Sequence, residues 1–287
     1  MNVRQLCISR RSLTAIGALV GVVSLAIGAH AALNSHSLDA AKAAALAEPH
    51  DSVARKAGRI ALVIGNGRYP DASAPLAQPV NDARALTAAL RHDGFDVDVV
   101  EDASRSDMLR AIDRMKSKIG SDSVVMLFFA GYGIQAGRES YMIPVDATIW
   151  KESDVRRAGV SVESVLDAMK ESGARAKLVV VDASRRNPYE RRFRSYSHGL
   201  APIAASDNAL ILSSATPGKV ADDSKGEHSM LMTELLNNLN SQSGFESVFN
   251  KTRLSIARSS EGEQVPTVSS SLQEDVSLAT AAVKAGS

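Results

Sequence analysis

The sequence has a single cysteine, Cys7, among 287 residues, and only 4% of its residues are aromatic. Cys7 lies in an N-terminal stretch that has the character of a targeting segment. If that segment is removed, the mature chain contains no thiol and no disulfide. Its stability must then come from a hydrophobic core, which a domain of roughly 220 residues is large enough to build.

The N-terminal stretch has the layout of a signal peptide. Three arginines (Arg4, Arg10 and Arg11) precede an almost wholly apolar run from Leu13 to Leu33, and no acidic residue occurs before Asp39. The tripeptide Ala29-His30-Ala31 places small residues at the two positions that a signal peptidase reads. We expect cleavage after Ala31 and export, to the bacterial periplasm or the medium.

Two alternatives stay open for this segment. Ser9-Arg10-Arg11-Ser12-Leu13 also fits a twin-arginine signal, which would carry the domain across the membrane already folded. The run 13–29 is long enough to be an uncleaved inner-membrane anchor, although it is short for a hydrocarbon core of ~30 Å. Membrane association is expected only in that second case.

The rest of the composition is that of a globular protein. Charged residues make up 23% of the chain and its formal net charge is +1, so no nucleic-acid partner is implied. We expect a signal peptide at 1–31, an Ala-rich linker at 32–58, one domain at 59–275 and a C-terminal tail at 276–287.

Short apolar runs alternate with segments of helical periodicity. The runs are at 60–64, 95–100, 124–129, 178–181 and 209–212, and the helical segments lie near 83–90, 108–119, 162–169, 231–239 and 245–256. Strands that are apolar on both faces need helices on both sides of a mostly parallel sheet. The predicted fold class is therefore α/β, with three layers.

Loops that follow the strands of such a sheet converge at one edge, where ligands usually bind. The first loop, Gly65 to Tyr69, contains two glycines, but Pro70, Pro75 and Pro79 prevent the immediate helix that dinucleotide binding requires. The chain also lacks a Walker-type loop, a metal-spaced His/Cys cluster and a Gly-x-Ser-x-Gly elbow. No cofactor and no metal are predicted.

Five segments in the same order resemble the caspase-like domain of the bacterial metacaspase (orthocaspase) group. They are "RIALVIGNGRY" with "NDARALTAALRHDGFDV", then "VVMLFFAGYGIQAGRESYMIPVDA", "KLVVVDASRRNPY", "LILSSATPGKVADD" and "FNKTRLSIARSSEGEQVPTVSSSL". The resemblance covers 59–272. It implies a caspase-like sheet flanked by helices on both faces and the ancestry of a cysteine endopeptidase.

The resemblance fails at the two catalytic positions. Tyr132 stands where the family has its histidine, and Ser184 stands where it has its nucleophilic cysteine. A serine needs a general base, and a phenol with a pKa of about 10 is protonated at pH 7 and cannot supply one. Losing nucleophile and base together costs on the order of 10⁶ in turnover in other proteases. Ordinary peptidase activity is therefore not expected.

The resemblance assigns roles to the remaining site residues. The backbone amides of Gly133 and Ser184 would form the oxyanion pocket, and Asp182 and Asp82 would line the pocket for a basic side chain. Asp82 has an alternative role as an N-terminal cap, because it precedes a helical segment. Tyr132 and Ser184 are expected to hydrogen-bond to each other.

The segment from Arg185 to Arg194 carries five arginines and one glutamate, with tyrosine and phenylalanine interleaved. We expect either a solvated loop or a docking site for an acidic partner. The function predicted overall is that of an exported pseudoprotease that binds a peptide or protein. The alternative is an active hydrolase with Ser184 as nucleophile and His198 as its base.

Overall fold

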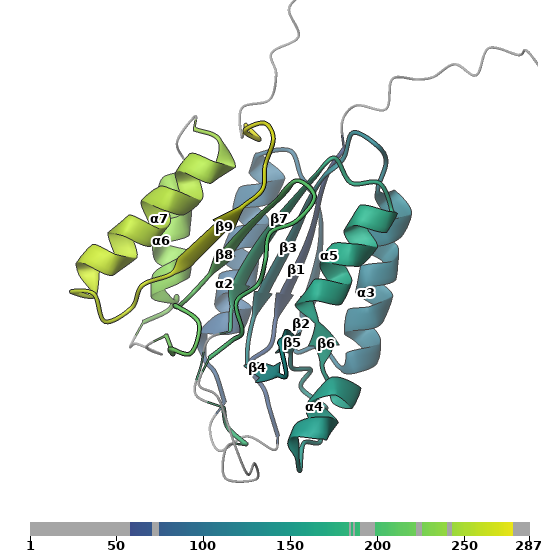
Figure 1. Ribbon diagram of the computed structural model, residues 1–287, viewed down its shortest axis with the longest axis vertical. Coiled ribbons are helices and arrows are strands. Elements are labelled where there is room, and N and C mark those ends of the chain that lie inside the picture. The colour runs from purple at the N-terminus through teal and green to yellow at the C-terminus, as the bar shows by residue number, and fades with distance from the viewer. Residues whose placement is uncertain are drawn as a thin grey trace, which may run out of the picture. The chain divides into compact units, whose positions relative to one another are not determined.

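Five of the strands of the main sheet coincide with the apolar runs of the sequence (Figure 1). The computed structural model describes residues 58–70, 75–183, 185, 187–189, 199–221, 226–239 and 243–277. The sheet has the order β2-β1-β3-β7-β8-β9, and its pairs are parallel except β8 with β9. The strands are β1 (Arg59–Gly65), β2 (Asp96–Glu101), β3 (Val124–Ala130), β7 (Ala176–Asp182), β8 (Ala209–Ser213) and β9 (Thr267–Ser270).

The central strands are buried on both faces, as their continuous apolar sequence predicts. All seven residues of β3 are buried. Because successive side chains of a strand point to opposite faces, Val124, Met126 and Phe128 join one core, and Val125, Leu127 and Phe129 join the other. The α/β class and the three layers are thereby confirmed.

Helices cover both faces of the sheet (Figure 1). The first core includes residues of α2 (Gln78–His92), α6 (Met230–Leu239) and α7 (Phe245–Ser259). The second includes residues of α3 (Arg105–Lys118) and α5 (Val162–Glu171). The helix α2 begins only at Gln78, with Pro79 in its first turn, so the loop after β1 is too long for a dinucleotide-binding turn.

A second sheet of three short strands lies near the end of the main sheet at which β1, β3 and β7 terminate (Figure 1). It contains β4 (Gly133–Ala136), β5 (Glu139–Met142) and β6 (Val160–Ser161), all paired antiparallel. The short helix α4 (Glu152–Ala158) precedes β6. Neither this sheet nor α4 was predicted from the hydrophobic pattern of the sequence.

In the described part of the chain, no helix combines the length and the apolar character needed to cross a membrane. The predicted signal peptide and linker lie outside the described residues, apart from Gly58.

Candidate functional site

The loops that follow β1, β3 and β7 meet at one edge of the main sheet. The register pairs Gly65 with Ala130, and Ala130 with Asp182, so these three strands end at the same level. Tyr132 and Ser184 each follow two residues later in their own loops. The fold therefore brings the two dyad-equivalent loops together, as the sequence predicts for a parallel sheet. We call this end of the sheet the carboxyl edge.

Tyr132 is buried in a cluster of tyrosines at the carboxyl edge. Its side chain is 6% exposed and packs edge to face against Tyr69, with ring centroids 4.8 Å apart. The Tyr132 amide donates to the Tyr69 hydroxyl at 3.0 Å, and that hydroxyl donates to the Ile143 carbonyl at 2.9 Å. Burial raises the pKa of Tyr69 far above its ordinary value, so its hydroxyl stays protonated. Tyr189 joins the same apolar cluster.

The glycines on either side of Tyr132 are required by close packing. A Cβ atom at position 131 would lie 2.5 Å from the Tyr69 hydroxyl oxygen, and one at position 133 would lie 2.8 Å from the Ala183 carbonyl oxygen. Both distances are shorter than van der Waals contact allows. The Gly-Tyr-Gly sequence therefore has a packing reason that is independent of catalysis.

The Gly133 amide, predicted to line the oxyanion pocket, donates a hydrogen bond to the Ala183 carbonyl at 3.0 Å. A donor engaged in this way is not available to a substrate oxyanion unless that bond opens. Ser184, the other predicted donor, lies outside the described residues, as does the expected Tyr132–Ser184 contact. The oxyanion role of this pair stays a prediction.

Asp182 ends β7 with its carboxylate fully inside the protein. Its side chain is 2% exposed, and its Oδ2 has no hydrogen-bond partner in the described part of the chain. That oxygen lies 3.7 Å from the Nη2 atom of Arg185, which is equally buried. Arg185 also donates from Nη1 to the carbonyls of Gly131 and Asp182. The ion pair is therefore embedded among backbone acceptors at the carboxyl edge.

Asp82 does not cap its own helix. It lies in the second turn of α2, whose N-cap is Ala77 without a side-chain hydrogen bond. Its carboxylate instead accepts from the Ser229 amide, at the start of α6, and lies 2.8 Å from His228 Nδ1. The capping alternative for α2 was thus wrong, because the helix begins four residues earlier and Asp82 faces a partner 146 positions away in the chain.

Asp82 and Asp182 are electrostatically coupled. Burial first, and then the negative charge of Asp182, raise the pKa of the Asp82 carboxyl from its ordinary value of 3.8 to about 6. Hydrogen bonds from His228 and Ser229 act in the opposite direction. The two acidic residues predicted to bind a basic side chain therefore lie in one environment. We call them the acidic pair.

The arginine-rich segment divides into buried and undescribed parts. Arg185 is 2% exposed and Tyr189 is 1% exposed, so neither belongs to a solvated docking surface. The charge of the neighbouring residues predicts an exposed loop and contains no information about the burial of these two side chains. Arg186 and residues 190–198, which include His198, lie outside the described residues. Docking of an acidic partner stays a prediction for that remainder alone.

In the glycine-containing loop after β1, backbone amides that could bind a phosphate are already hydrogen-bonded within the protein. The amides of Gly67 and Arg68 both donate to Asp102 Oδ1 at 2.9 Å, and the Arg68 side chain forms an ion pair with the same carboxylate. A phosphate needs such amides unpaired. Throughout the described ranges, no group of three or more His, Cys, Asp or Glu side chains is placed to hold a metal ion.

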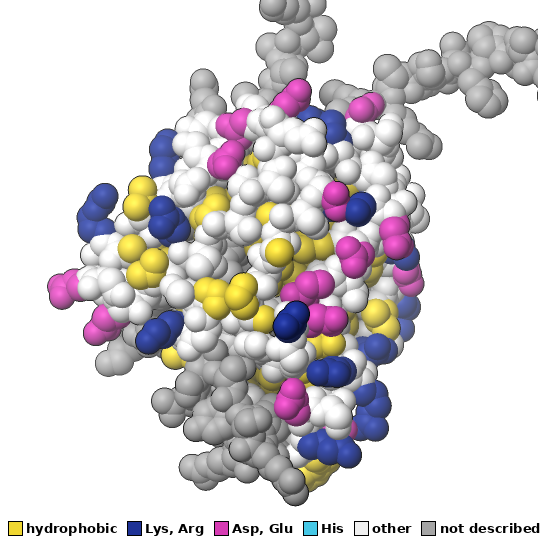
Figure 2. Space-filling view, viewed as in Figure 1, with side chains coloured by type: hydrophobic (Ala, Val, Ile, Leu, Met, Phe, Trp, Pro, Cys, Tyr) yellow, Lys and Arg dark blue, Asp and Glu magenta, His cyan; other side chains and the backbone are white. Residues whose placement is uncertain are grey.

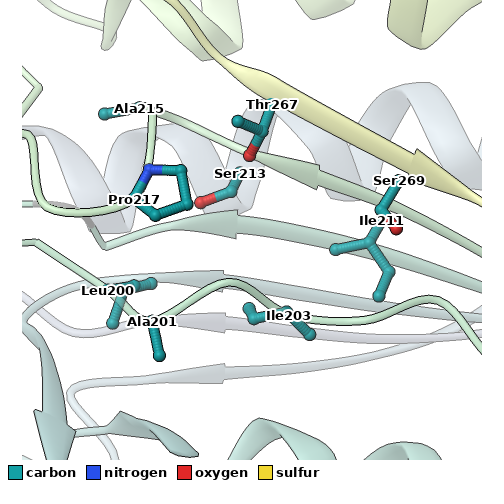
Figure 3. A pocket seen from close by; sticks show the side chains of 9 residues that line it. All are labelled: Leu200, Ala201, Ile203, Ile211, Ser213, Ala215, Pro217, Thr267 and Ser269. Atoms are coloured by element: carbon teal, nitrogen blue, oxygen red, sulfur yellow. The ribbon is translucent and has the colours of Figure 1, made fainter. Parts of the chain in front are cut away.

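One small cavity lies between β8, β9 and the segment after Gly199 (Figure 3). Its walls include the hydroxyl-bearing side chains of Ser213, Thr267 and Ser269, and the apolar side chains of Leu200 and Ile203. Its volume is about 10 Å³, which is about what one water molecule requires. It is a packing defect rather than a ligand site.

Charged side chains of both signs lie on the face of the molecule shown in Figure 2, with several lysine and arginine side chains along its lower right edge and acidic side chains nearer its centre. The basic side chains do not cover this face as a broad stripe of the kind that nucleic-acid binding uses.

The family model of the caspase domain matches residues 58–277, so the chain belongs to the caspase-domain family of peptidases. Among curated proteins, it is similar to the human mucosa-associated lymphoid tissue lymphoma translocation protein 1, with 29% identity over 133 residues. The mouse homologue is 30% identical over 136 residues. Each alignment covers 46% of this chain and 16% of the relative, so the chain spans only a small part of either protein.

Proposed function

We propose that this chain is an exported, catalytically inactive caspase-like domain of the metacaspase type that binds a peptide or protein segment. The observation that carries the proposal is the environment of Tyr132. At the position where the resembled group has histidine, a phenol is buried against Tyr69 and cannot accept a proton from a serine. Export is supported by the signal-like sequence of residues 1–31.

The acidic pair supports binding of a basic side chain. Two buried carboxylates, Asp82 and Asp182, have only one permanently charged counterpart in the described residues, Arg185. A lysine or arginine side chain of a ligand would supply the missing positive charge. The ligand class proposed is therefore a peptide segment that contains lysine or arginine.

Turnover and binding assays on the full chain test the two parts of this proposal. Fluorogenic peptides with arginine or lysine before the cleavable bond are expected to show no turnover, with or without calcium. Turnover that disappears in Ser184→Ala, or labelling of Ser184 by a fluorophosphonate, would establish the alternative of an active serine hydrolase.

Binding is measured with the same peptides in uncleavable, fluorescein-labelled form by fluorescence polarisation. Asp182→Asn is expected to weaken binding at least about tenfold, because it removes a buried charge that faces the ligand. Asp122→Asn is the matched control, since Asp122 is exposed in a turn before β3. Equal binding by both variants would exclude the acidic pair as the ligand site.

A further inference from the structure

Residues 226–229 lie against the first two turns of α2, beside Asp82. The Gln78 side-chain amide donates to the carbonyls of Gly226 and His228, each at 3.2 Å, and the Asn81 amide donates to the Glu227 carbonyl at 3.3 Å. Side chains of α2 therefore hold this segment through its backbone. We call residues 226–229 the strap.

The strap covers Asp82. The side chain of Asp82 is completely buried, whereas that of His228 is 28% exposed, so the imidazole lies between the carboxylate and solvent. His228 Nδ1 is 2.8 Å from Asp82 Oδ1, and the Ser229 amide is 3.3 Å from each carboxylate oxygen. No ligand can reach Asp82 while these contacts persist.

His228 is a weaker partner for the Asp82 carboxylate than a lysine or arginine side chain would be. The groups facing Asp82 are His228 and Ser229 from the strap and Asp182 from β7, and Asp182 is itself paired with Arg185. His228 offers Asp82 a single ring nitrogen, whereas a guanidinium or ammonium group is fully charged at neutral pH and brings several N–H donors. A lysine or arginine side chain would therefore interact more strongly with the acidic pair than His228 does.

We propose that the strap is an autoinhibitory segment, with His228 in the position of a ligand's basic side chain, and that a peptide with arginine or lysine displaces it. This inference rests on the proposed function. An open hollow of about 440 Å³ is lined by strap residues together with Met230, Thr233 and Glu234, so free space adjoins the strap. The helix α6 begins directly after the strap, at Met230, and would hold the C-terminal end of the strap in place when the rest is displaced.

The test compares arginine and citrulline peptides, which have nearly the same shape but differ in charge. Both are labelled with fluorescein and titrated with the full chain at pH 7.5. His228→Ala and Gln78→Ala each remove contacts of the strap without altering a carboxylate of the acidic pair. Both are expected to bind the arginine peptide about tenfold more tightly than the wild type, because the open form is more populated.

The affinity for the citrulline peptide should be the same in both variants as in the wild type. His92 is exposed at the end of α2, the helix that carries Gln78, so His92→Ala should behave as the wild type. If the wild type binds the arginine peptide and neither strap variant binds it more tightly, the strap has no inhibitory role and the proposed function stands. If no variant binds it, the proposed function fails together with the inference. Equal gains for citrulline would show that charge does not select the ligand.

Discussion

The hydroxyl group of Tyr69 holds the backbone of Tyr132 in place. It accepts from the Tyr132 amide at 3.0 Å while it donates to the carbonyl of Ile143 at 2.9 Å, and the two aromatic rings pack edge to face. One buried hydroxyl thus joins the loops after β1 and β3 to the chain that follows β5. Three segments of the carboxyl edge depend on this single side chain.

We therefore expect Tyr69→Phe to destabilise the domain by about 1–3 kcal/mol, because it removes the acceptor of the buried Tyr132 amide and leaves the Ile143 carbonyl with the Asn66 side chain as its donor. The midpoint of thermal unfolding should fall by roughly 2–4 °C for each kcal/mol in a domain of this size. Tyr141→Phe is the control, since the Tyr141 hydroxyl bonds to Glu139, an exposed residue that water can solvate instead. Equal losses in the two variants would contradict the bridging role of Tyr69.

The positive charge of Arg185 is expected to stabilise the folded domain. Arg185→Ala leaves the buried Asp182 carboxylate without its ion pair, which typically costs about 3–5 kcal/mol. Arg185→Lys should recover little of this loss, because one amine cannot serve two carbonyls and a carboxylate as the guanidinium does. Urea denaturation measures both variants.

The exposed ion pair between Arg84 and Glu101 provides the comparison for Arg185. Arg84 is 64% exposed, and Arg84→Ala should cost far less stability than Arg185→Ala, because solvent screens an exposed ion pair. Should Arg185→Ala cost no more than Arg84→Ala, Arg185 would be solvated in solution rather than buried.

Asp82 should make the stability of the domain depend on pH. Its pKa is about 6 in the folded state and 3.8 ordinarily, so the folded state binds the proton more tightly. The stabilising contribution is complete below pH 3.8 and is lost as the pH rises through about 6. Up to about 3 kcal/mol of unfolding free energy should disappear across this window, at 1.36 kcal/mol per pKa unit.

Asp82→Asn keeps the shape and the acceptor oxygen but cannot ionise. Urea denaturation from pH 4 to pH 7 should show the wild type losing stability relative to this variant as the pH rises. A difference between the two proteins that stays constant over this range would show that the Asp82 carboxyl titrates normally.

The sequence predicted the elements that are apolar on both sides. The runs that became β3 and β7 are continuous because helices cover both faces, so their pattern alone identified a buried parallel sheet. The strand β9 could not be predicted from the hydrophobic pattern, because it is a half-exposed edge strand. It consists of serine and threonine, with Val268 as its one large apolar residue. Edge strands of this kind carry little hydrophobic signal.

The partners of the site residues could not be predicted in the same way. Asp82 was interpreted from its neighbours in the chain, but its environment is set by His228 and Asp182, which only the folded topology brings near. The run of arginines that contains Arg185 predicted either a solvated loop or a docking site for an acidic partner. The Arg185 guanidinium instead lies inside the protein, where it donates to the backbone carbonyls of Gly131 and Asp182 at the carboxyl edge. Periodicity reports burial by apolar contacts and contains no information about such polar contacts.

Restoring the dyad tests whether the scaffold around Tyr132 is still that of a peptidase. The double variant Tyr132→His, Ser184→Cys would supply a thiol and an imidazole at the two dyad-equivalent positions, the combination that yields a reactive thiolate. The change of Tyr132 to histidine removes ring volume from the tyrosine cluster, so some loss of stability is expected together with any gain of activity.

We expect the double variant to cleave fluorogenic arginine peptides and each single variant to remain inactive, because nucleophile and base act as a unit. Labelling with iodoacetamide provides a second readout, since a thiolate activated by histidine reacts faster than the thiol of Ser184→Cys alone. If the double variant folds, as judged by its cooperative unfolding, and shows neither turnover nor enhanced labelling, the two positions do not face each other. The interpretation of Tyr132 as the replaced general base would then be wrong, because a tyrosine remote from Ser184 could not explain the loss of catalysis.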